Sequence, residues 1–322
     1  MNEIITKQTL GFVFPGQGSQ AVGMMAALAS DFPQVRARFD SASEVLGFDL
    51  WQLVASGPEE DLNRTQNTQP ALLAASVATW DIWCAEGGPR PALMAGHSFG
   101  EYSALVCAGA LDFATAIGLV AERGRLMQSA VPPGEGGMAA ILGLDLGPLE
   151  EACAEAAATL GVCSCANLNA PGQIVIAGTA AAVERACELA AGRGAKRAMK
   201  LAVSVPAHCA LMRPAAEGLA ARLAEVAFAP PGIAVVHNVD VASHTDAAAI
   251  RDALIRQLYS PVRWIETIEQ FARAGVTHVA ECGPGKVLAP LIKRIDKNLQ
   301  TVALNEPAGL RDFIALARNE LA

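Results

Sequence analysis

The chain has 322 residues, of which 52% are hydrophobic, 17% charged and 5% aromatic, and its net charge is −8. This composition can bury a substantial core and excludes a disordered chain, and the scarcity of aromatic residues favours a helix-rich α/β interior over a β-sandwich. The negative charge argues against non-specific nucleic-acid binding, which depends on basic residues.

The N-terminal segment and the hydrophobic stretches predict neither an export signal nor a membrane span. The first ten residues include a lysine and a glutamate but no apolar run, and no stretch approaches the ~18 apolar residues of a spanning helix. The eight cysteines form no Cys-x-x-Cys pair, so we expect buried thiols and no metal site. We therefore expect a soluble, cytoplasmic protein.

The first part of the chain predicts alternating buried strands and helices. Leu10–Phe14 is a short apolar run that ends at a proline and a glycine-rich turn, as a buried strand does. Helical patterns follow from about residue 22 to about residue 87. Pro91–Gly96 is a second apolar strand, and a helix after it runs to about Gly109.

A Pro- and Gly-rich linker at Val131 introduces a second unit. Its patterns predict strand–helix–strand–strand–helix–strand, the ferredoxin-like order, at Met138–Leu142, Gly147–Leu160, Val162–Leu168, Ile174–Ala177, Ala180–Gly192 and Lys196–Val203. The first unit then resumes, with strands near Val235 and at Thr277–Ala280. We predict a discontinuous large α/β domain, residues 1–131 and 204–322, and a small inserted domain, residues 132–203.

A candidate nucleophile lies where the second strand turns into a helix. Gly96-His97-Ser98-Phe99-Gly100 fits the pattern G-x-S-x-G in its expected strand–turn–helix context. Such a sharp turn needs small flanking residues, and the N–H groups at the start of the helix can hold a developing oxyanion. We therefore predict that Ser98 is a nucleophile.

A serine nucleophile needs a base, and the chain offers five histidines: His97, His208, His237, His244 and His278. Adjacent residues on a turn rarely point together, which disfavours His97. His208 lies far downstream of the serine, as in other elbow enzymes, although a purely structural role stays open. Between Ser98 and His208 the only aspartates are Asp112 and Asp145, and neither lies in a notable loop, so no third member of a triad is evident.

Six segments, in order over nearly the whole chain, resemble one family. They are Phe14-Pro15-Gly16-Gln17-Gly18-Ser19-Gln20, Gly96-His97-Ser98-Phe99-Gly100-Glu101-Tyr102, Ala121-Glu122-Arg123-Gly124, Ser204-Val205-Pro206-Ala207-His208, Gln257-Leu258-Tyr259-Ser260-Pro261-Val262 and Glu281-Cys282-Gly283-Pro284-Gly285-Lys286. Together they resemble the malonyl-CoA:acyl-carrier-protein transacylases of fatty-acid synthesis, with Phe99 where many relatives have leucine.

The resemblance implies an α/β-hydrolase-like core with a ferredoxin-like insertion. It implies ping-pong transfer of malonyl from malonyl-CoA to the phosphopantetheine thiol of acyl carrier protein, without metal or redox cofactor, by a monomer. Ser98 would be the nucleophile and His208 its base, oriented by the main-chain carbonyl of Gln257. The main-chain N–H groups of Gln17 and Phe99 would form the oxyanion hole.

Arg123 would pair with the malonyl carboxylate, again by resemblance. It lies in a largely apolar helical stretch, where a guanidinium is costly unless an anion meets it, and its neighbour Glu122 points away. Pairing with some other acid is the structural alternative. A buried cation argues against an esterase or thioesterase on the same elbow. Polyketide synthesis, malonate metabolism and an inactive binding module are the other interpretations.

The acidic chain would need a local basic surface to approach an acidic carrier protein. The candidate clusters are Arg193, Lys196, Arg197 and Lys200 in the small domain, and Lys286, Lys293 and Arg294 near the C-terminus. Solvated surface charge is the alternative interpretation of both clusters.

Overall fold

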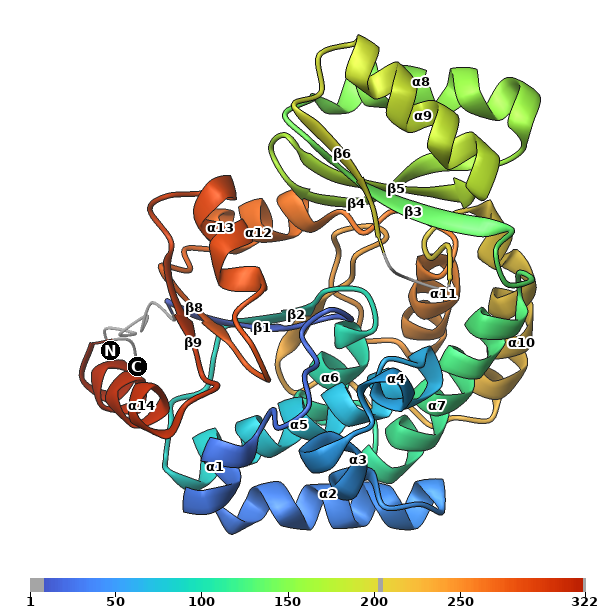
Figure 1. Ribbon diagram of the computed structural model, residues 1–322. Helices are drawn as coiled ribbons and strands as arrows, with labels where there is room; N and C mark the ends of the chain where they lie inside the picture. The colour runs from blue at the N-terminus through green and yellow to red at the C-terminus, as the bar shows by residue number, and fades with distance from the viewer. Residues whose placement is uncertain (1–8, 202–204, 321–322) are drawn as a thin grey trace.

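The structure is a computed structural model that describes residues 9–201 and 205–320. Within these residues it contains a five-stranded parallel sheet and a four-stranded antiparallel sheet, each packed against helices (Figure 1). The chain is therefore a mixed α/β protein, as its composition predicts.

The parallel sheet has the strand order β7-β2-β1-β8-β9. Its strands are β1 (Leu10–Phe14), β2 (Leu93–Gly96), β7 (Ala234–Val236), β8 (His278–Glu281) and β9 (Gln300–Ala303). All neighbouring strands run parallel, so their carboxyl ends meet at one edge of the sheet. The predicted nucleophile follows β2 at this edge, where ligands of open parallel sheets commonly bind.

Helices cover both faces of the parallel sheet (Figure 1). They are α1 (Ala26–Asp31), α2 (Pro33–Leu46), α3 (Leu50–Ser56), α4 (Glu59–Leu62), α5 (Thr65–Ala85), α6 (Gly100–Cys107), α7 (Phe113–Ser129), α10 (Arg213–Ala224), α11 (Ala247–Gln257), α12 (Trp264–Arg273), α13 (Leu288–Ile295) and α14 (Pro307–Glu320), with a 3₁₀ turn, η1 (Ala210–Met212). None of these described helices is long and apolar enough to cross a membrane.

Burial on both faces explains why the strands were recognisable in the sequence. Phe12 and Phe14 of β1 pack into the cluster that contains α5, whereas Val13 points to the other face and packs with Trp264 and Phe271 of α12. A strand that is buried on both sides is apolar at every position, as β1 is.

The antiparallel sheet has the order β4-β5-β3-β6 and carries two helices on one face (Figure 1). Its elements are β3 (Gly136–Leu142), α8 (Leu146–Leu160), β4 (Cys163–Ala170), β5 (Gln173–Thr179), α9 (Ala180–Gly192) and β6 (Arg197–Lys200). Cys163 and Cys165 both lie in the cluster beneath α8 and α9, so the expectation of buried thiols is confirmed for these two cysteines.

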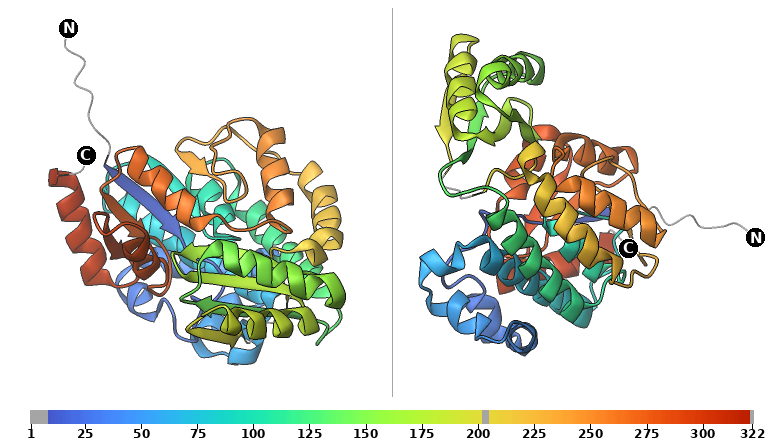
Figure 2. Two further views of the ribbon diagram at one scale, coloured as in Figure 1. Left: turned by 90° about the horizontal axis from the view of Figure 1, so that it is seen from above. Right: turned by 90° about the vertical axis from the view of Figure 1, so that its right-hand side faces the viewer.

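The other face of the small sheet packs on the rest of the protein. Met138, Ala166 and Val175 cluster with Cys209, which precedes η1. Strand β4 also pairs with the segment before α12, because Leu168 donates to the carbonyl of Val262 at 2.9 Å and the Val262 N–H donates to Ala166 at 2.9 Å. In Figure 2 (right) the unit projects from the main body on this side. These contacts join the small sheet to the edge where the elbow lies.

The predicted element types are confirmed, with small shifts in their bounds. The connection between the strands predicted at Val162–Leu168 and Ile174–Ala177 is shorter than predicted, because β4 continues through Ala170 and only Pro171 and Gly172 connect it to β5. The strand predicted at Lys196–Val203 is observed as Arg197–Lys200, and residues 202–204, with the predicted boundary between 203 and 204, lie outside the described residues.

Candidate active site

The elbow after β2 places Ser98 in a conformation that its neighbours enforce. Ser98 has a φ of 54°, in the left-handed region that side chains other than glycine rarely adopt. A Cβ at Gly96 would lie 1.8 Å from the main-chain carbon of Gly100, and one at Gly100 would lie 2.4 Å from the carbonyl oxygen of Phe14. Both glycines of the motif are therefore required by contact, as the sequence analysis expected.

His208 meets this serine, and His97 does not. Ser98 Oγ lies 2.7 Å from His208 Nε2, while His97 Nε2 lies 2.7 Å from Asn169 Oδ1 in the small sheet. His208 Nδ1 lies 2.8 Å from the main-chain oxygen of Gln257, a group that can only accept. The proton of neutral His208 is thereby fixed on Nδ1, which leaves Nε2 to accept the hydroxyl proton of Ser98.

The carbonyl of Gln257 lies where a triad would have a carboxylate. Asp112 is instead the N-cap of α7, where its side chain accepts from Thr115, and Asp145 precedes α8. The two aspartates between Ser98 and His208 thus have local positions at helix starts, and the absence of an acid candidate in the sequence has a structural reason.

Burial keeps His208 neutral. The imidazole is 3% exposed, and burial lowers the pKa of His208 to about 3, with the nearby Arg123 guanidinium adding to the decrease. The hydrogen bond to the Gln257 carbonyl opposes this shift. At neutral pH the imidazole is therefore in the form that can accept a proton.

Arg123 is completely buried on α7, and no carboxylate among the described residues pairs with it. Its Nη2 donates to Gln257 Oε1 at 2.9 Å, and its Nε and Nη1 have no hydrogen-bond partner among the described residues. The face of the Tyr102 ring lies 5.7 Å away. Glu122, the adjacent acid, pairs with the exposed Arg125 at 2.6 Å. The predicted separation of Arg123 and Glu122 is therefore confirmed, and burial lowers the pKa of Arg123.

Gln257 connects these groups through both its main chain and its side chain. Its carbonyl accepts from His208, its Oε1 accepts from Arg123, and its Nε2 donates to the carbonyl of Ser98 at 2.9 Å. A single residue at the end of α11 thus fixes the base, the buried cation and the elbow relative to one another.

The remaining two predicted residues lie on neighbouring segments. Phe99 is the N-cap of α6, and its side chain is fully buried. Gln17 follows Gly16, where a Cβ would lie 2.8 Å from the main-chain oxygen of His97, so the loop after β1 packs directly on the elbow. The main chains of Gln17 and Phe99 therefore belong to two segments in contact.

A cavity of about 1020 Å³ opens at this point between the parallel sheet edge and the small sheet. Ser98, His208 and Gln17 line it, together with residues of the small sheet such as Met138 and Asn167. Phe99, Arg123 and Gln257 are not among its lining residues. Ser98 and His208 thus lie on the cavity wall, whereas the buried Arg123 does not.

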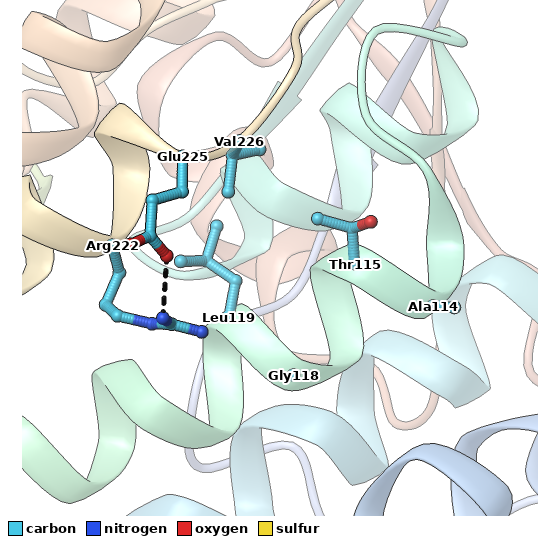
Figure 3. A pocket seen from close by; sticks show the side chains of 7 residues that line it. All are labelled: Ala114, Thr115, Gly118, Leu119, Arg222, Glu225 and Val226. Atoms are coloured by element: carbon cyan, nitrogen blue, oxygen red, sulfur yellow. Dashed lines mark hydrogen bonds and ion pairs between the residues drawn. The ribbon is translucent and has the colours of Figure 1, made fainter.

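A smaller pocket of about 270 Å³ lies between α7 and the end of α10 (Figure 3). Its lining includes Arg222 and Glu225, which pair with each other at 2.8 Å, and Thr115. None of the predicted site residues lines it. In the described part of the chain no group of three or more His, Cys, Asp or Glu side chains could hold a metal ion.

One polar residue that the sequence patterns did not indicate contacts the elbow. Asn238 Oδ1 accepts from the Ser98 N–H at 2.7 Å, and its Nδ2 donates to the carbonyl of Gly96 at 2.8 Å. A signal was present: Asn238 comes two residues after β7, the strand that pairs with β2, so it lies at the same sheet edge as Ser98.

Comparisons with known proteins agree with this geometry. Residues 11–310 match the family described as acyl transferase domain. The malonyl CoA-acyl carrier protein transacylase of Salmonella typhimurium strain LT2 is 58% identical over 299 residues, which cover 93% of this chain and 96% of the relative. The protein of the same name from Escherichia coli K12 is 57% identical over 305 residues, covering 95% and 98%.

Solved structures are similar over the same span. An acyl carrier protein S-malonyltransferase from Vibrio cholerae has 58% identity and a TM-score of 0.93, covering 95% of this chain and 99% of its own. A malonyl-transacylase in complex with its type II polyketide synthase acyl carrier protein has 55% identity and a TM-score of 0.94, with the same coverage.

Proposed function

Because this chain belongs to the acyl transferase domain family, we propose that it transfers malonyl from malonyl-CoA to the phosphopantetheine thiol of acyl carrier protein. The transfer supplies malonyl units for fatty-acid synthesis. The relatives named as malonyl CoA-acyl carrier protein transacylases match nearly the whole chain. On the level of residues, the proposal rests on the 2.7 Å contact of Ser98 Oγ with His208 Nε2, and on a buried arginine whose Nε and Nη1 have no hydrogen-bond partner among the described residues.

In the first half-reaction, His208 Nε2 accepts the proton of Ser98 Oγ, and the oxygen attacks the thioester carbonyl of malonyl-CoA. The main-chain N–H groups of Gln17 and Phe99 donate hydrogen bonds to the oxyanion. In other enzymes, one such donor stabilises the transition state by about 3 kcal/mol. Collapse breaks the carbon–sulfur bond, and the thiolate of coenzyme A takes the proton from His208. A malonyl ester on Ser98 remains.

In the second half-reaction, the phosphopantetheine thiol of the carrier protein gives its proton to His208. The resulting thiolate attacks the malonyl ester through a second oxyanion at the same two donors. Collapse breaks the ester bond, and Ser98 Oγ takes the proton back from His208. The carbonyl of Gln257 holds the imidazole in one tautomer through both halves, with the contact of 2.8 Å to Nδ1.

Arg123 gives the site its preference for malonyl over neutral acyl groups. A buried guanidinium with unused N–H groups is costly, and a substrate carboxylate would supply charge-assisted hydrogen bonds. Since Arg123 also bonds the Gln257 side chain, whose other end bonds Ser98, the carboxylate would be held at a fixed distance from the reacting ester.

We propose that the parallel-sheet unit, residues 1–131 and 204–322, is an α/β-hydrolase-like domain, and that residues 132–203 form a ferredoxin-like insertion. The sheet order β4-β5-β3-β6 with two helices on one face supports the second assignment. We further propose that the enzyme works in the cytoplasm as a monomer.

The nucleophile is tested by incubating the enzyme with malonyl-CoA in the absence of carrier protein. Mass spectrometry should find one malonyl group on the peptide that contains Ser98, and addition of carrier protein should remove it. Ser98→Ala should abolish the adduct. Ser103→Ala is the matched control, because Ser103 is a buried serine on α6, the helix that follows the elbow, and its hydroxyl has no partner among the described residues. An adduct that persists in Ser98→Ala would contradict the assignment of Ser98 as the nucleophile. Release of malonate instead of transfer to the carrier protein would indicate a hydrolase.

A further inference from the structure

One asparagine side chain joins the two peptide groups on either side of His97. Asn238 is completely buried, and its amide accepts from the Ser98 N–H at 2.7 Å and donates to the Gly96 carbonyl at 2.8 Å. Gly96 is the last residue of β2, and the pairing of β2 with β7 ends one residue earlier, at Ala95, so β7 supplies no partner for these groups. The Asn238 amide substitutes for the missing strand.

The contact falls on a residue of the site that has a strained backbone conformation. Ser98 has a φ of 54°, and a non-glycine residue keeps such a conformation only where the surrounding structure enforces it. Gly96 and Gly100 permit the tight turn, but their small size cannot fix its shape. The two hydrogen bonds from Asn238 can, because they hold the peptides on both sides of the turn.

Asn238 is itself held by the helix that follows the elbow. Its N–H donates to Glu101 Oε1, and Glu101 is a fully buried residue of α6. Its carbonyl accepts from the N–H of Arg263 at 3.3 Å. Asn238 therefore bonds both Ser98 and Glu101, and the Glu101 N–H in turn donates to the Ser98 carbonyl at the start of α6.

These bonds also decide which N–H of the elbow can face a substrate. The Ser98 N–H is used by Asn238, so the next one along the chain, that of Phe99, is left at the start of the helix. A change in the Ser98 peptide would rotate both Ser98 Oγ and the Phe99 N–H.

We propose that Asn238 is a positioning residue for acyl transfer, which holds the elbow so that Ser98 Oγ meets His208 while the Phe99 N–H faces the oxyanion. This inference rests on the proposed function, because it takes Ser98 as the nucleophile.

The test compares Asn238→Leu, which has a similar shape and no hydrogen bonds, with Asn238→Asp, which keeps an acceptor for the Ser98 N–H. Single-turnover formation of the malonyl ester is measured against malonyl-CoA concentration. Since a displacement of about 1 Å costs roughly 100-fold in rate, the leucine variant should acylate about 100-fold more slowly, with KM changed by less than about threefold. The aspartate variant should recover part of the rate and lose about tenfold, because one of two bonds remains.

A buried hydrogen bond elsewhere provides the control. Thr79→Val removes the 2.9 Å bond from Thr79 Oγ1 to the Ala75 carbonyl inside α5, and Thr79 is as buried as Asn238. This variant should lose thermal stability but acylate at the parent rate. The rate of Ser98 modification by a small sulfonyl fluoride, which needs no malonyl-CoA site, should fall in parallel with acylation in the Asn238 variants only.

Folded Asn238→Leu with a rate within about threefold of the parent would overturn the inference, as would a rise in KM at constant rate or an equal loss in Thr79→Val. If the leucine variant does not fold, Asn238→Asp decides: a parent-like rate overturns the inference and an intermediate rate supports it. Failure of the proposed function has a different signature, an adduct that survives Ser98→Ala.

Discussion

The proposed selection of malonyl by Arg123 yields the sharpest prediction. Arg123→Ala removes a guanidinium that is completely buried and whose only hydrogen bond among the described residues is the 2.9 Å contact of Nη2 with Gln257 Oε1. Its Nε and Nη1 have no hydrogen-bond partner in the part of the chain that the structure describes. The substitution retains the hydrogen bond between His208 and the Gln257 carbonyl, and the one from Gln257 Nε2 to the Ser98 carbonyl. Ser98 and His208 should therefore keep their contacts.

The expected magnitude follows from those unused groups. A hydrogen bond to a charged partner is worth about 1.5–3 kcal/mol, so a carboxylate that engages the free N–H groups accounts for about 2–4 kcal/mol. With about 1.4 kcal/mol per factor of ten, malonyl transfer should fall roughly 30- to 1,000-fold in kcat/KM. Acetyl transfer should hold steady or rise, because an acetyl group has no carboxylate to lose and the guanidinium lowers the pKa of His208.

The assay measures kcat/KM for malonyl-CoA and acetyl-CoA with the same carrier protein, alongside the thermal unfolding midpoint. Arg125→Ala is the matched control, since Arg125 lies on the same helix, is exposed and pairs with Glu122 at 2.6 Å. It should leave both activities unchanged. If both activities of Arg123→Ala fell together while the protein stayed folded, Arg123 would be structural and the malonyl preference would have lost its chemical basis.

Two further predictions concern the base and the docking surface. Burial lowers the pKa of His208 from 6.5 to about 3, so the unfolded chain binds this proton more readily and the free energy of unfolding should fall as pH decreases from about 6.5 towards about 3. In His208→Gln, the free energy of unfolding should fall less steeply with decreasing pH, by up to about 1.4 kcal/mol per pH unit. The same variant should acylate more slowly by several orders of magnitude. Equal slopes of unfolding free energy against pH in the parent and the variant would contradict the lowered pKa. Lys196 and Arg197 are exposed beside or on β6, whereas Arg193 and Lys200 are engaged in ion pairs. Reversing Lys196 and Arg197 to glutamate should raise the KM for carrier protein and leave that for malonyl-CoA unchanged, and equal effects on both substrates would remove this surface from consideration.

Local sequence determined the elements and the elbow. The apolar run of β1 and the glycines around Ser98 carry their reasons within a few residues, because a buried parallel strand must be apolar throughout and a tight strand-to-helix turn excludes a Cβ. The order of strands and helices between Gly136 and Lys200 was predictable for the same reason: each element has its own period of apolar residues.

Residue patterns alone left His208 a favoured histidine among five, and the role of Gln257 came only from family resemblance. The tertiary structure brings His208 to Ser98 across 110 positions of sequence, and Gln257 to both from a third segment. Spacing along the chain holds no information about such contacts, since they depend on how the segment before η1 and the end of α11 pack against the elbow.

The hydrogen bonds between Asn238 and the elbow depend entirely on the tertiary structure. Asn238 is an ordinary polar residue in the sequence, and it acquires its contacts because β7 pairs with β2 and ends at the same edge. Arg123 could be predicted to be costly from its apolar neighbours, but only the structure determines that Gln257 takes one N–H and that Nε and Nη1 have no partner among the described residues. Sequence thus sets the elements and the local strain, whereas hydrogen-bond partners between segments depend on the packing of distant parts of the chain.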